Sequence, residues 1–193
     1  THCTSSAASD VYKRQASGAG VGPLDVNYIL GVVKAYVTRV GEGPMPTEIY
    51  DPIGEEIAKK GGEVGATTGR PRRCGWFDAV TVKRIIKSNN VSALCLTKID
   101  VLDFLDTIKI CVDYNYRDGS NDYAECMDLE AVEPKYIECK GWKTPLKGIN
   151  RYEDLPLEAI EFIKKVEEVC ELPVDIVSTG PDDEGTIVVN EDI

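Results

Sequence analysis

The sequence has very little of what builds a metal site or a disulfide framework. Its only histidine is His2, and its seven cysteines are scattered, odd in number and never spaced as C-x-x-C. Structural zinc sites and small disulfide-stapled domains depend on such spacings. The sequence therefore indicates neither kind of site, and reduced cysteines of this sort fit the cytoplasm.

Long apolar runs and positive charge are also scarce. No apolar stretch approaches the ~20 residues that span a bilayer, and no basic segment followed by an apolar stretch indicates a secretory signal. Lys and Arg number 22 against 33 Asp and Glu, which gives a formal charge of −11 and disfavours binding to a nucleic-acid backbone. We expect a cytoplasmic protein with no membrane span and no nucleic-acid partner.

What is present is the composition of a folded globular chain. Hydrophobic residues make up 42% and charged residues 28% of the 193 residues, which suits one large domain or two small ones. Residues 1–15 are small, polar and without periodicity, so we expect a disordered or foreign lead-in there. The folded part is expected to begin at residue 16.

Apolar periodicity predicts helices and strands that alternate along the chain, which is typical of an α/β fold. We expect helices at 26–37, 55–60, 76–87 and 157–172, and a helical turn at 101–105. We expect strands at 92–97, 107–114, 174–177 and 186–189, with a hairpin turn at 117–119. Residues 122–145 mix short strand-like pieces whose order the sequence does not settle.

Polar residues follow directly after the predicted strand at 92–97. In Thr97-Lys98-Ile99-Asp100, the aspartate suits guanine, because a carboxylate accepts hydrogen bonds from both N1–H and the 2-amino group, and the lysine stem can lie along the base. Open α/β sheets place ligand-binding loops at such strand ends. The alternative is a polar helix cap after a strand.

A second polar turn, Ser178-Thr179-Gly180, follows the strand at 174–177. Its backbone N–H groups could meet the guanine O6, so the two strand ends could enclose a base from both sides. The alternative is a simple β-turn in which Gly180 supplies unusual dihedral angles.

An arginine-rich loop is the most unusual segment of this acidic chain. Arg70, Arg72 and Arg73 follow two hydroxyl residues and a glycine in the loop 66–73, which makes a concentrated set of donors for carboxylate or phosphate groups. A solvated basic loop is the alternative, but the stiffening by Pro71 favours anion binding. A further glycine-rich segment, 40–44, would let a sugar or base approach the backbone, although a turn that ends a helix explains it equally well.

These segments together resemble the adenylosuccinate synthetase family. The resemblance runs from about Ala16 to the C-terminus and rests on five segments: 38–44, 65–70, 74–76, 96–102 and 178–181. It implies a P-loop-NTPase-like α/β fold, a mixed or parallel sheet with flanking helices, incomplete here, plus a small strand-rich insertion. It also implies that residues 16–193 are the C-terminal portion of a single domain.

The family couples GTP hydrolysis to the joining of IMP and L-aspartate, and gives adenylosuccinate, GDP and phosphate in purine biosynthesis. It uses Mg²⁺ and is usually a cytoplasmic homodimer. By this resemblance, GTP would be bound by Arg72, Lys98, Ile99, Asp100, Ser178, Thr179 and Gly180. Aspartate would be bound by Ala66, Thr67, Thr68, Gly69, Arg70, Pro71 and Arg72, and IMP by Val40, Gly43 and Arg70.

Two departures from the family pattern matter. Pro71 stands where the family commonly has another arginine. The family's N-terminal part, with its phosphate loop, catalytic aspartate and catalytic histidine, has no counterpart, so we expect no catalytic residue and no magnesium ligand in this chain and no activity from it alone. The alternatives are a non-catalytic guanine-nucleotide-binding α/β module and a purely structural α/β domain.

Overall fold

The computed structural model describes residues 26–65, 69–116 and 132–190, together with Gly18, Gly20 and Gly22. The strands are β1 (Leu30–Lys34), β2 (Tyr36–Arg39), β3 (Arg73–Asp78), β4 (Ala93–Thr97), β5 (Thr107–Tyr116), β6 (Val132–Lys140), β7 (Val174–Ser178) and β8 (Thr186–Val188). The α-helices are α3 (Pro52–Lys60), α4 (Ala79–Asn89) and α5 (Leu157–Cys170), and the short 3-10 helices are η2 (Ile99–Leu102), η4 (Tyr152–Asp154) and η5 (Asp183–Gly185).

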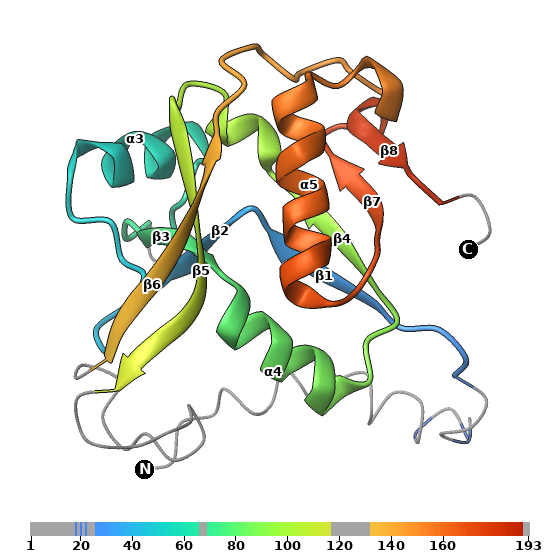
Figure 1. The fold of residues 1–193 in the computed structure, drawn as a ribbon, viewed down its shortest axis with the longest axis horizontal. Coiled ribbons are helices and arrows are strands. Elements are labelled where there is room, and N and C mark those ends of the chain that lie inside the picture. Colours follow the sequence, from blue (N-terminus) through green and yellow to red (C-terminus); the bar gives the residue numbers. More distant parts are fainter. Residues whose placement is uncertain are drawn as a thin grey trace.

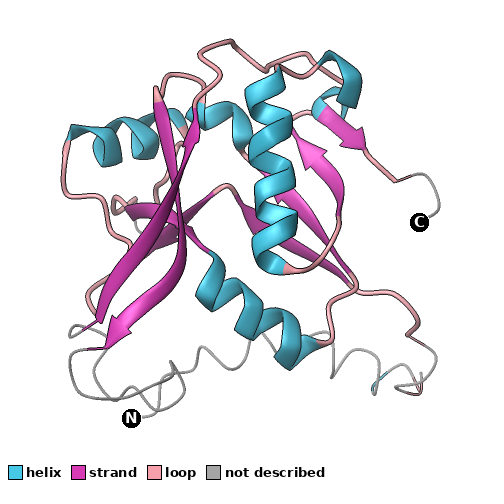
Figure 2. Cartoon of the chain, in the orientation of Figure 1, coloured by secondary structure: helices cyan, strands magenta, loops and turns pink. Residues whose placement is uncertain are grey.

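The described strands form two four-stranded sheets (Figure 1). The first has the order β1-β4-β7-β8, in which β1, β4 and β7 run parallel and β8 is antiparallel. The second has the order β2-β3-β5-β6, in which only β3 and β5 are parallel. Helix α5 contacts both β7 and β6, so it lies between the two sheets (Figures 1 and 2).

The helices begin and end where local chemistry requires. The carboxylate of Asp51 accepts a hydrogen bond from the Ile53 N–H at 2.8 Å and caps α3, whose first residue is a proline. Asp78 caps α4 by accepting from the Thr81 N–H at 3.1 Å. Asn90 ends α4 in a left-handed conformation with φ of 51°.

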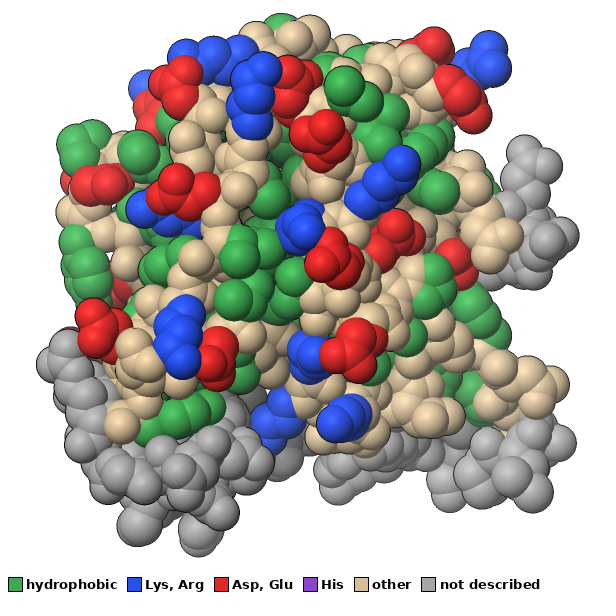
Figure 3. Space-filling view, in the orientation of Figure 1, with side chains coloured by type: hydrophobic (Ala, Val, Ile, Leu, Met, Phe, Trp, Pro, Cys, Tyr) green, Lys and Arg blue, Asp and Glu red, His purple; other side chains and the backbone are tan. Residues whose placement is uncertain are grey.

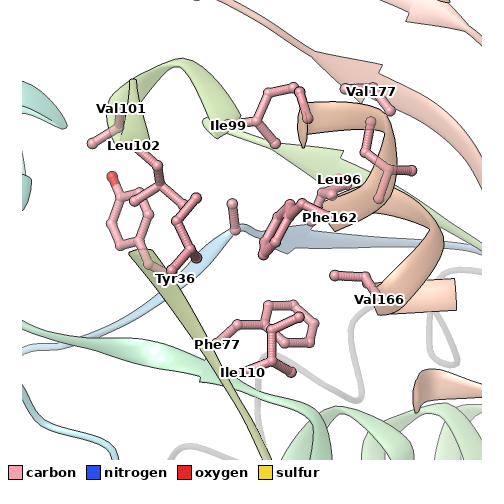
Figure 4. Close-up of a cluster of buried hydrophobic side chains, with 14 of the residues drawn as sticks. Tyr36, Phe77, Leu96, Ile99, Val101, Leu102, Ile110, Phe162, Val166 and Val177 are labelled. Atoms are coloured by element: carbon pink, nitrogen blue, oxygen red, sulfur yellow. The ribbon is translucent and has the colours of Figure 1, made fainter. Parts of the chain in front are cut away.

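One continuous core joins the two sheets and α5. Figure 4 shows Phe77 and Ile110 of the second sheet beneath Phe162 of α5. Leu96 of β4 and Ile99 of η2 are fully buried in the same cluster. The loops that follow β4 therefore rest on packed side chains, which fixes their position.

The expected helix at 26–37 is wrong. Residues 30–34 form β1, which pairs in parallel with β4 from Leu30↔Ala93 to Lys34↔Thr97, and 36–39 form β2. The valines of this segment imitate helical spacing, but β-branched residues suit strands and the pairing with β4 decides between the two. Val32 is 72% exposed on the edge strand.

The other elements agree better with expectation. The helix predicted at 76–87 starts late, because Trp76 and Phe77 are buried in β3 and Asp78 caps the helix only at Ala79. The remaining predicted helices and strands are present, with ends that differ by a few residues. Within 122–145, which the sequence left unordered, the described part contains β6.

Some expectations fall on residues that the structure does not describe. These are the lead-in at 1–15, the turn at 117–119, and Ala66, Thr67 and Thr68 of the arginine-rich loop. Within the described ranges, no helix has both the length and the apolar character to cross a membrane. On the face shown in Figure 3, acidic and basic side chains are interspersed, so the excess of negative charge does not gather in one patch there.

Candidate functional site

Three parallel strands end side by side at one edge of the first sheet (Figure 1). Lys34 at the end of β1 is in register with Thr97 at the end of β4, and Leu96 is in register with Val177, one residue before β7 ends at Ser178. The predicted segments 98–100 and 178–180 are therefore neighbours. This edge, at the carboxyl ends of parallel strands, is where α/β sheets bind ligands.

The segment after β4 is held in an unusual backbone conformation. Lys98 has a φ of 60°, in the left-handed region that costs a non-glycine residue about 1–2 kcal/mol. Ile99 is completely buried, so neither its side chain nor its backbone is exposed. Asp100 follows on η2 and is half-buried.

The carboxyl group of Asp100 lies in a site that favours its neutral form. Burial raises its pKa, and backbone N–H groups and the charges of Lys98 and Lys147 oppose this only in part. A carboxylate that is poorly solvated gains more from two donors of a ligand than one that water already satisfies. The predicted role of Asp100 as a double acceptor for guanine stays a prediction.

The hydroxyls of the turn after β7 are used inside the protein. Thr179 is fully buried, and its hydroxyl donates to the carbonyl of Ile149 at 2.8 Å. The Ser178 hydroxyl donates to the carbonyl of Gly180 at 2.8 Å. These side chains fix the shape of the turn. The Thr179 N–H also donates to the Gly185 carbonyl at 2.8 Å, so contacts with a ligand would come from Ser178 and Gly180, which are half-buried.

The segment 146–149 is a third part of this edge that the sequence analysis missed. It is tied to η2, because the Leu146 N–H donates to Asp103 at 3.0 Å, and to the turn after β7 through the Ile149 carbonyl. Lys147 adds a positive charge that acts on Asp100. Gly148, with a φ of 90°, and Pro145 just before the segment are the local signals of a turn here.

The described part of the arginine-rich loop is closed by backbone hydrogen bonds. The Gly65 N–H donates to the Arg70 carbonyl and the Gly69 N–H to the Gly65 carbonyl, both at 2.8 Å. Gly69 has a φ of 62°, which a glycine adopts without strain. Arg70 and Pro71 are exposed, and Arg72 is half-buried.

A buried glutamate joins the arginine-rich loop to the strand ends. Glu63 is 2% exposed, and its carboxylate accepts from Lys34 at 2.8 Å, Lys98 at 2.9 Å, Arg72 at 3.1 Å and the hydroxyl of Tyr36 at 2.7 Å. We call these five residues the Glu63 cluster. No local pattern in the sequence indicates this cluster, because the four partners of Glu63 lie on β1, β2, the arginine-rich loop and the segment after β4.

The Glu63 cluster carries an excess of positive charge in an acidic protein. Burial alone would raise the pKa of Glu63, but hydrogen bonds from Lys34, Lys98 and Tyr36 outweigh it and lower the pKa to about 2. The carboxylate is therefore ionised at neutral pH, and one negative charge faces three positive ones. The side chains of the three cations are 27–36% exposed, so an anionic ligand can approach them.

A second cluster holds the glycine-rich loop at 40–44. Arg73 forms a two-fold ion pair with Glu48, and its Nη1 donates to the carbonyls of Gly41 at 3.2 Å and Gly43 at 2.8 Å. We call these the Arg73 cluster. The sequence analysis assigned no ligand to Arg73; the structure makes it the support of the loop that contains the predicted ligand residues Val40 and Gly43.

The loop at 40–44 borders a cavity of about 750 Å³. The cavity also reaches Lys34 of the Glu63 cluster, Thr38 on β2, and Asp78 and Thr81 at the start of α4. Val40, which is 52% exposed, forms part of its wall. The cavity therefore extends from the predicted IMP loop to Lys34, whereas residues 98–100 and 178–180 do not line it.

Comparison with known proteins gives consistent results. The family model described as adenylosuccinate synthetase matches residues 1–187. Curated proteins named adenylosuccinate synthetase include one from Hahella chejuensis, 52% identical over 177 residues, and one from Neisseria meningitidis serogroup C, 49% identical over 193 residues. These alignments cover 90% and 98% of this chain, but 41% and 43% of the relatives.

A solved structure supports the same family assignment. A fully ligated adenylosuccinate synthetase from Plasmodium falciparum superposes with a TM-score of 0.84 at 34% identity, over 91% of this chain and 43% of that chain. The likeness confirms the expected α/β fold with mixed sheets and flanking helices. The chain spans about two fifths of the length of the relatives it matches.

Proposed function

Since this chain belongs to the adenylosuccinate synthetase family, we propose that it supplies the guanine-binding and aspartate-binding part of an enzyme that joins IMP and L-aspartate at the expense of GTP. The products would be adenylosuccinate, GDP and phosphate, in the synthesis of AMP. The family match over residues 1–187 does not favour the alternatives of a non-catalytic guanine-nucleotide module or a purely structural domain.

The observation that carries this proposal is the meeting of two strand-end segments. Lys98 to Asp100 and Ser178 to Gly180 follow neighbouring parallel strands, next to the arginine-rich loop. A base held between the two segments would present N1–H and its 2-amino group to Asp100. Adenine lacks that pair of donors, so the aspartate would select guanine.

The other substrates would lie beside this base. Arg70 and Arg72 would bind the carboxylates of aspartate, with Ala66 to Gly69 and Pro71 shaping the loop around it. Val40, Gly43 and Arg70 would contact IMP, and of these three Val40 lines the cavity of about 750 Å³. Guanidinium groups suit this task because their planar fork binds a carboxylate through two hydrogen bonds.

In the family reaction, a base removes the N1 proton of IMP, the 6-oxygen attacks the γ-phosphate of GTP, and aspartate then displaces the 6-phosphoryl group. The residues of this chain would bind and orient the substrates, which is a large part of catalysis in phosphoryl transfer. The family also uses Mg²⁺. Among the described residues no group of three or more His, Cys, Asp or Glu could hold a metal ion, so we assign none of these steps to a metal here.

The setting of the enzyme follows from the same family. We propose a cytoplasmic homodimer with GTP, IMP and L-aspartate as its ligands, and no role for nucleic acid or a membrane. The net charge of −11 agrees with the absence of nucleic acid from this set.

The test is the choice between nucleotides by the purified 193-residue chain. NMR titration, which detects weak binding, should show that GDP binds and ADP does not. Asp100→Asn should weaken the binding of GDP and strengthen the binding of xanthosine diphosphate. The reason is that an amide accepts from the xanthine N1–H and donates to the 2-oxo group. The change should be about tenfold or more, as for one charge-assisted contact.

Asp103→Asn is the matched control. Asp103 lies just after η2 and accepts from the Trp142 indole at 2.7 Å and the Leu146 N–H at 3.0 Å, so its role is internal. This variant should lower stability but keep the preference for GDP over xanthosine diphosphate. Equal preferences in wild type and Asp100→Asn would refute the guanine-binding assignment.

A further inference from the structure

We propose that Glu63 is a positioning residue that holds Lys98 and Arg72 in one fixed arrangement, so that these two side chains act as a single site for an anionic nucleotide. The inference rests on the proposed function for its ligand, and on the Glu63 cluster for its geometry. Glu63 itself would not touch the ligand.

The first argument is that Glu63 fixes both groups by side chain and backbone. Lys98 donates to Glu63 Oε1 at 2.9 Å and to the Gly61 carbonyl at 2.7 Å, so its ammonium is bound twice to the segment 61–63. Arg72 donates to Glu63 Oε2 at 3.1 Å, and its backbone N–H donates to the Glu63 carbonyl at 2.9 Å. One residue thus sets the relative position of two loops.

The second argument is electrostatic. Lys34, Lys98 and Arg72 all lie within 3.1 Å of one carboxylate, so their positive charges are close to each other. Like charges at such separations repel, and the repulsion is stronger near a protein interior than in water. Without the negative charge of Glu63 the three side chains would move apart into solvent.

The third argument is that the cluster is incomplete as it stands. Arg72 Nε is buried and has no hydrogen-bond partner. A buried donor without a partner is costly, so the bonds among the described residues leave this guanidinium incompletely paired. Glu63 holds Arg72 through Nη1, so the side chain is fixed while the Nε side of the guanidinium stays unpaired.

The test uses the 193-residue chain with GDP as the probe. Glu63→Gln keeps the size of the side chain and removes the charge. We expect this variant to bind GDP about tenfold more weakly than wild type. Arg72→Leu should have an effect of similar size. Because the two residues act as one unit, the double variant should be little worse than either single variant, whereas independent effects would multiply to about a hundredfold.

Glu48→Gln is the matched control. Glu48 is also a partly buried carboxylate bound to an arginine, but it belongs to the Arg73 cluster. It should leave GDP binding within about twofold of wild type and should combine additively with Arg72→Leu. A merely structural role for Glu63 would make the two glutamine variants behave alike.

A second readout needs no nucleotide. Reductive methylation of Lys98 should be slow in wild type, because its ammonium is hydrogen-bonded, and several times faster in Glu63→Gln. If that variant does not fold, Glu63→Asp keeps the charge but is too short to reach all partners, and it should give smaller changes of the same kind.

The outcomes separate the inference from the function on which it rests. If wild type binds no GDP, both are overturned. If GDP binds normally but the effects of Glu63→Gln and Arg72→Leu multiply, or Lys98 reacts at the wild-type rate in Glu63→Gln, the positioning role alone is overturned. Coupled effects together with faster methylation of Lys98 support it.

Discussion

The two predicted binding loops are held by clusters of opposite sign. In the Glu63 cluster an anion lies at the centre and gathers cationic side chains, two of which are predicted to bind ligands. In the Arg73 cluster a cation lies at the centre and gathers backbone carbonyls of the loop at 40–44 together with Glu48. The first arrangement fixes side chains that are predicted to bind ligands, and the second fixes the shape of a backbone.

This difference has a physical basis in what each ligand needs. Charged groups on a ligand require side chains of the opposite charge, and these must be kept near one another against their mutual repulsion. A sugar that lies against a glycine-rich loop requires a fixed backbone surface instead. The following predictions are ordered by the size of the expected effect.

The largest effect should come from removing the central charge of the Glu63 cluster. Glu63→Gln should lower the free energy of unfolding by about 3 kcal/mol, because it leaves three cations without their buried partner. Glu48→Gln should cost about 1.5 kcal/mol, since Arg73 keeps its carbonyl acceptors. Urea denaturation measures both, and equal losses would remove the distinction between the clusters.

The next effect should appear at the centre of the Arg73 cluster. Arg73→Leu should cost about 2 kcal/mol of stability, because it breaks the ion pair with Glu48 and two hydrogen bonds to carbonyls. It should weaken IMP binding and leave GDP binding nearly unchanged. Arg72→Leu should weaken GDP binding and leave IMP binding nearly unchanged. Calorimetric titration of both variants with IMP and with GDP measures the four affinities.

The smallest effect at ordinary pH should be the dependence of the Glu63 cluster on acid. The pKa of Glu63 is lowered from 4.5 to about 2, so its contribution to stability is fully present above pH 4.5 and is lost as the pH falls toward 2. The gap in stability between wild type and Glu63→Gln should therefore stay constant from pH 7 to about 5 and shrink below 4.5. A gap that shrinks already between pH 7 and 5 would contradict the low pKa.

Local patterns in the sequence point to the segments that are predicted to contact ligands, but not to the residues that hold these segments in place. Residues 98–100 and 178–180 could be proposed because a strand and the turn after it are both local signals. Glu63 could not, because its four partners lie on β1, β2, the segment after β4 and the arginine-rich loop. Arg73 was set aside for the same reason, since nothing local connects it to Gly41 and Gly43.

The wrong helix at 26–37 has a related cause. The spacing of its valines was compatible with a helix, and only the partner strand β4, some 60 residues later, decides for a strand. The mistake matters for the site, since the end of that strand delivers Lys34 to the Glu63 cluster. Local patterns predict a helix or strand well when the residues that stabilise it are close in the sequence, and poorly when its partner strand is far away.

At Lys98, which has a left-handed backbone, the residue that is best for stability differs from the residue expected to be best for nucleotide binding. Glycine or asparagine would adopt a φ of 60° with less strain, whereas lysine keeps its place through its ammonium contacts with Glu63 and Gly61. In a library randomised at this position, sorting for folded protein alone would enrich the small residues, and sorting for nucleotide capture would enrich lysine. The residue at this turn is thus a point where evolution toward a sturdier protein and evolution toward a better binder take different directions.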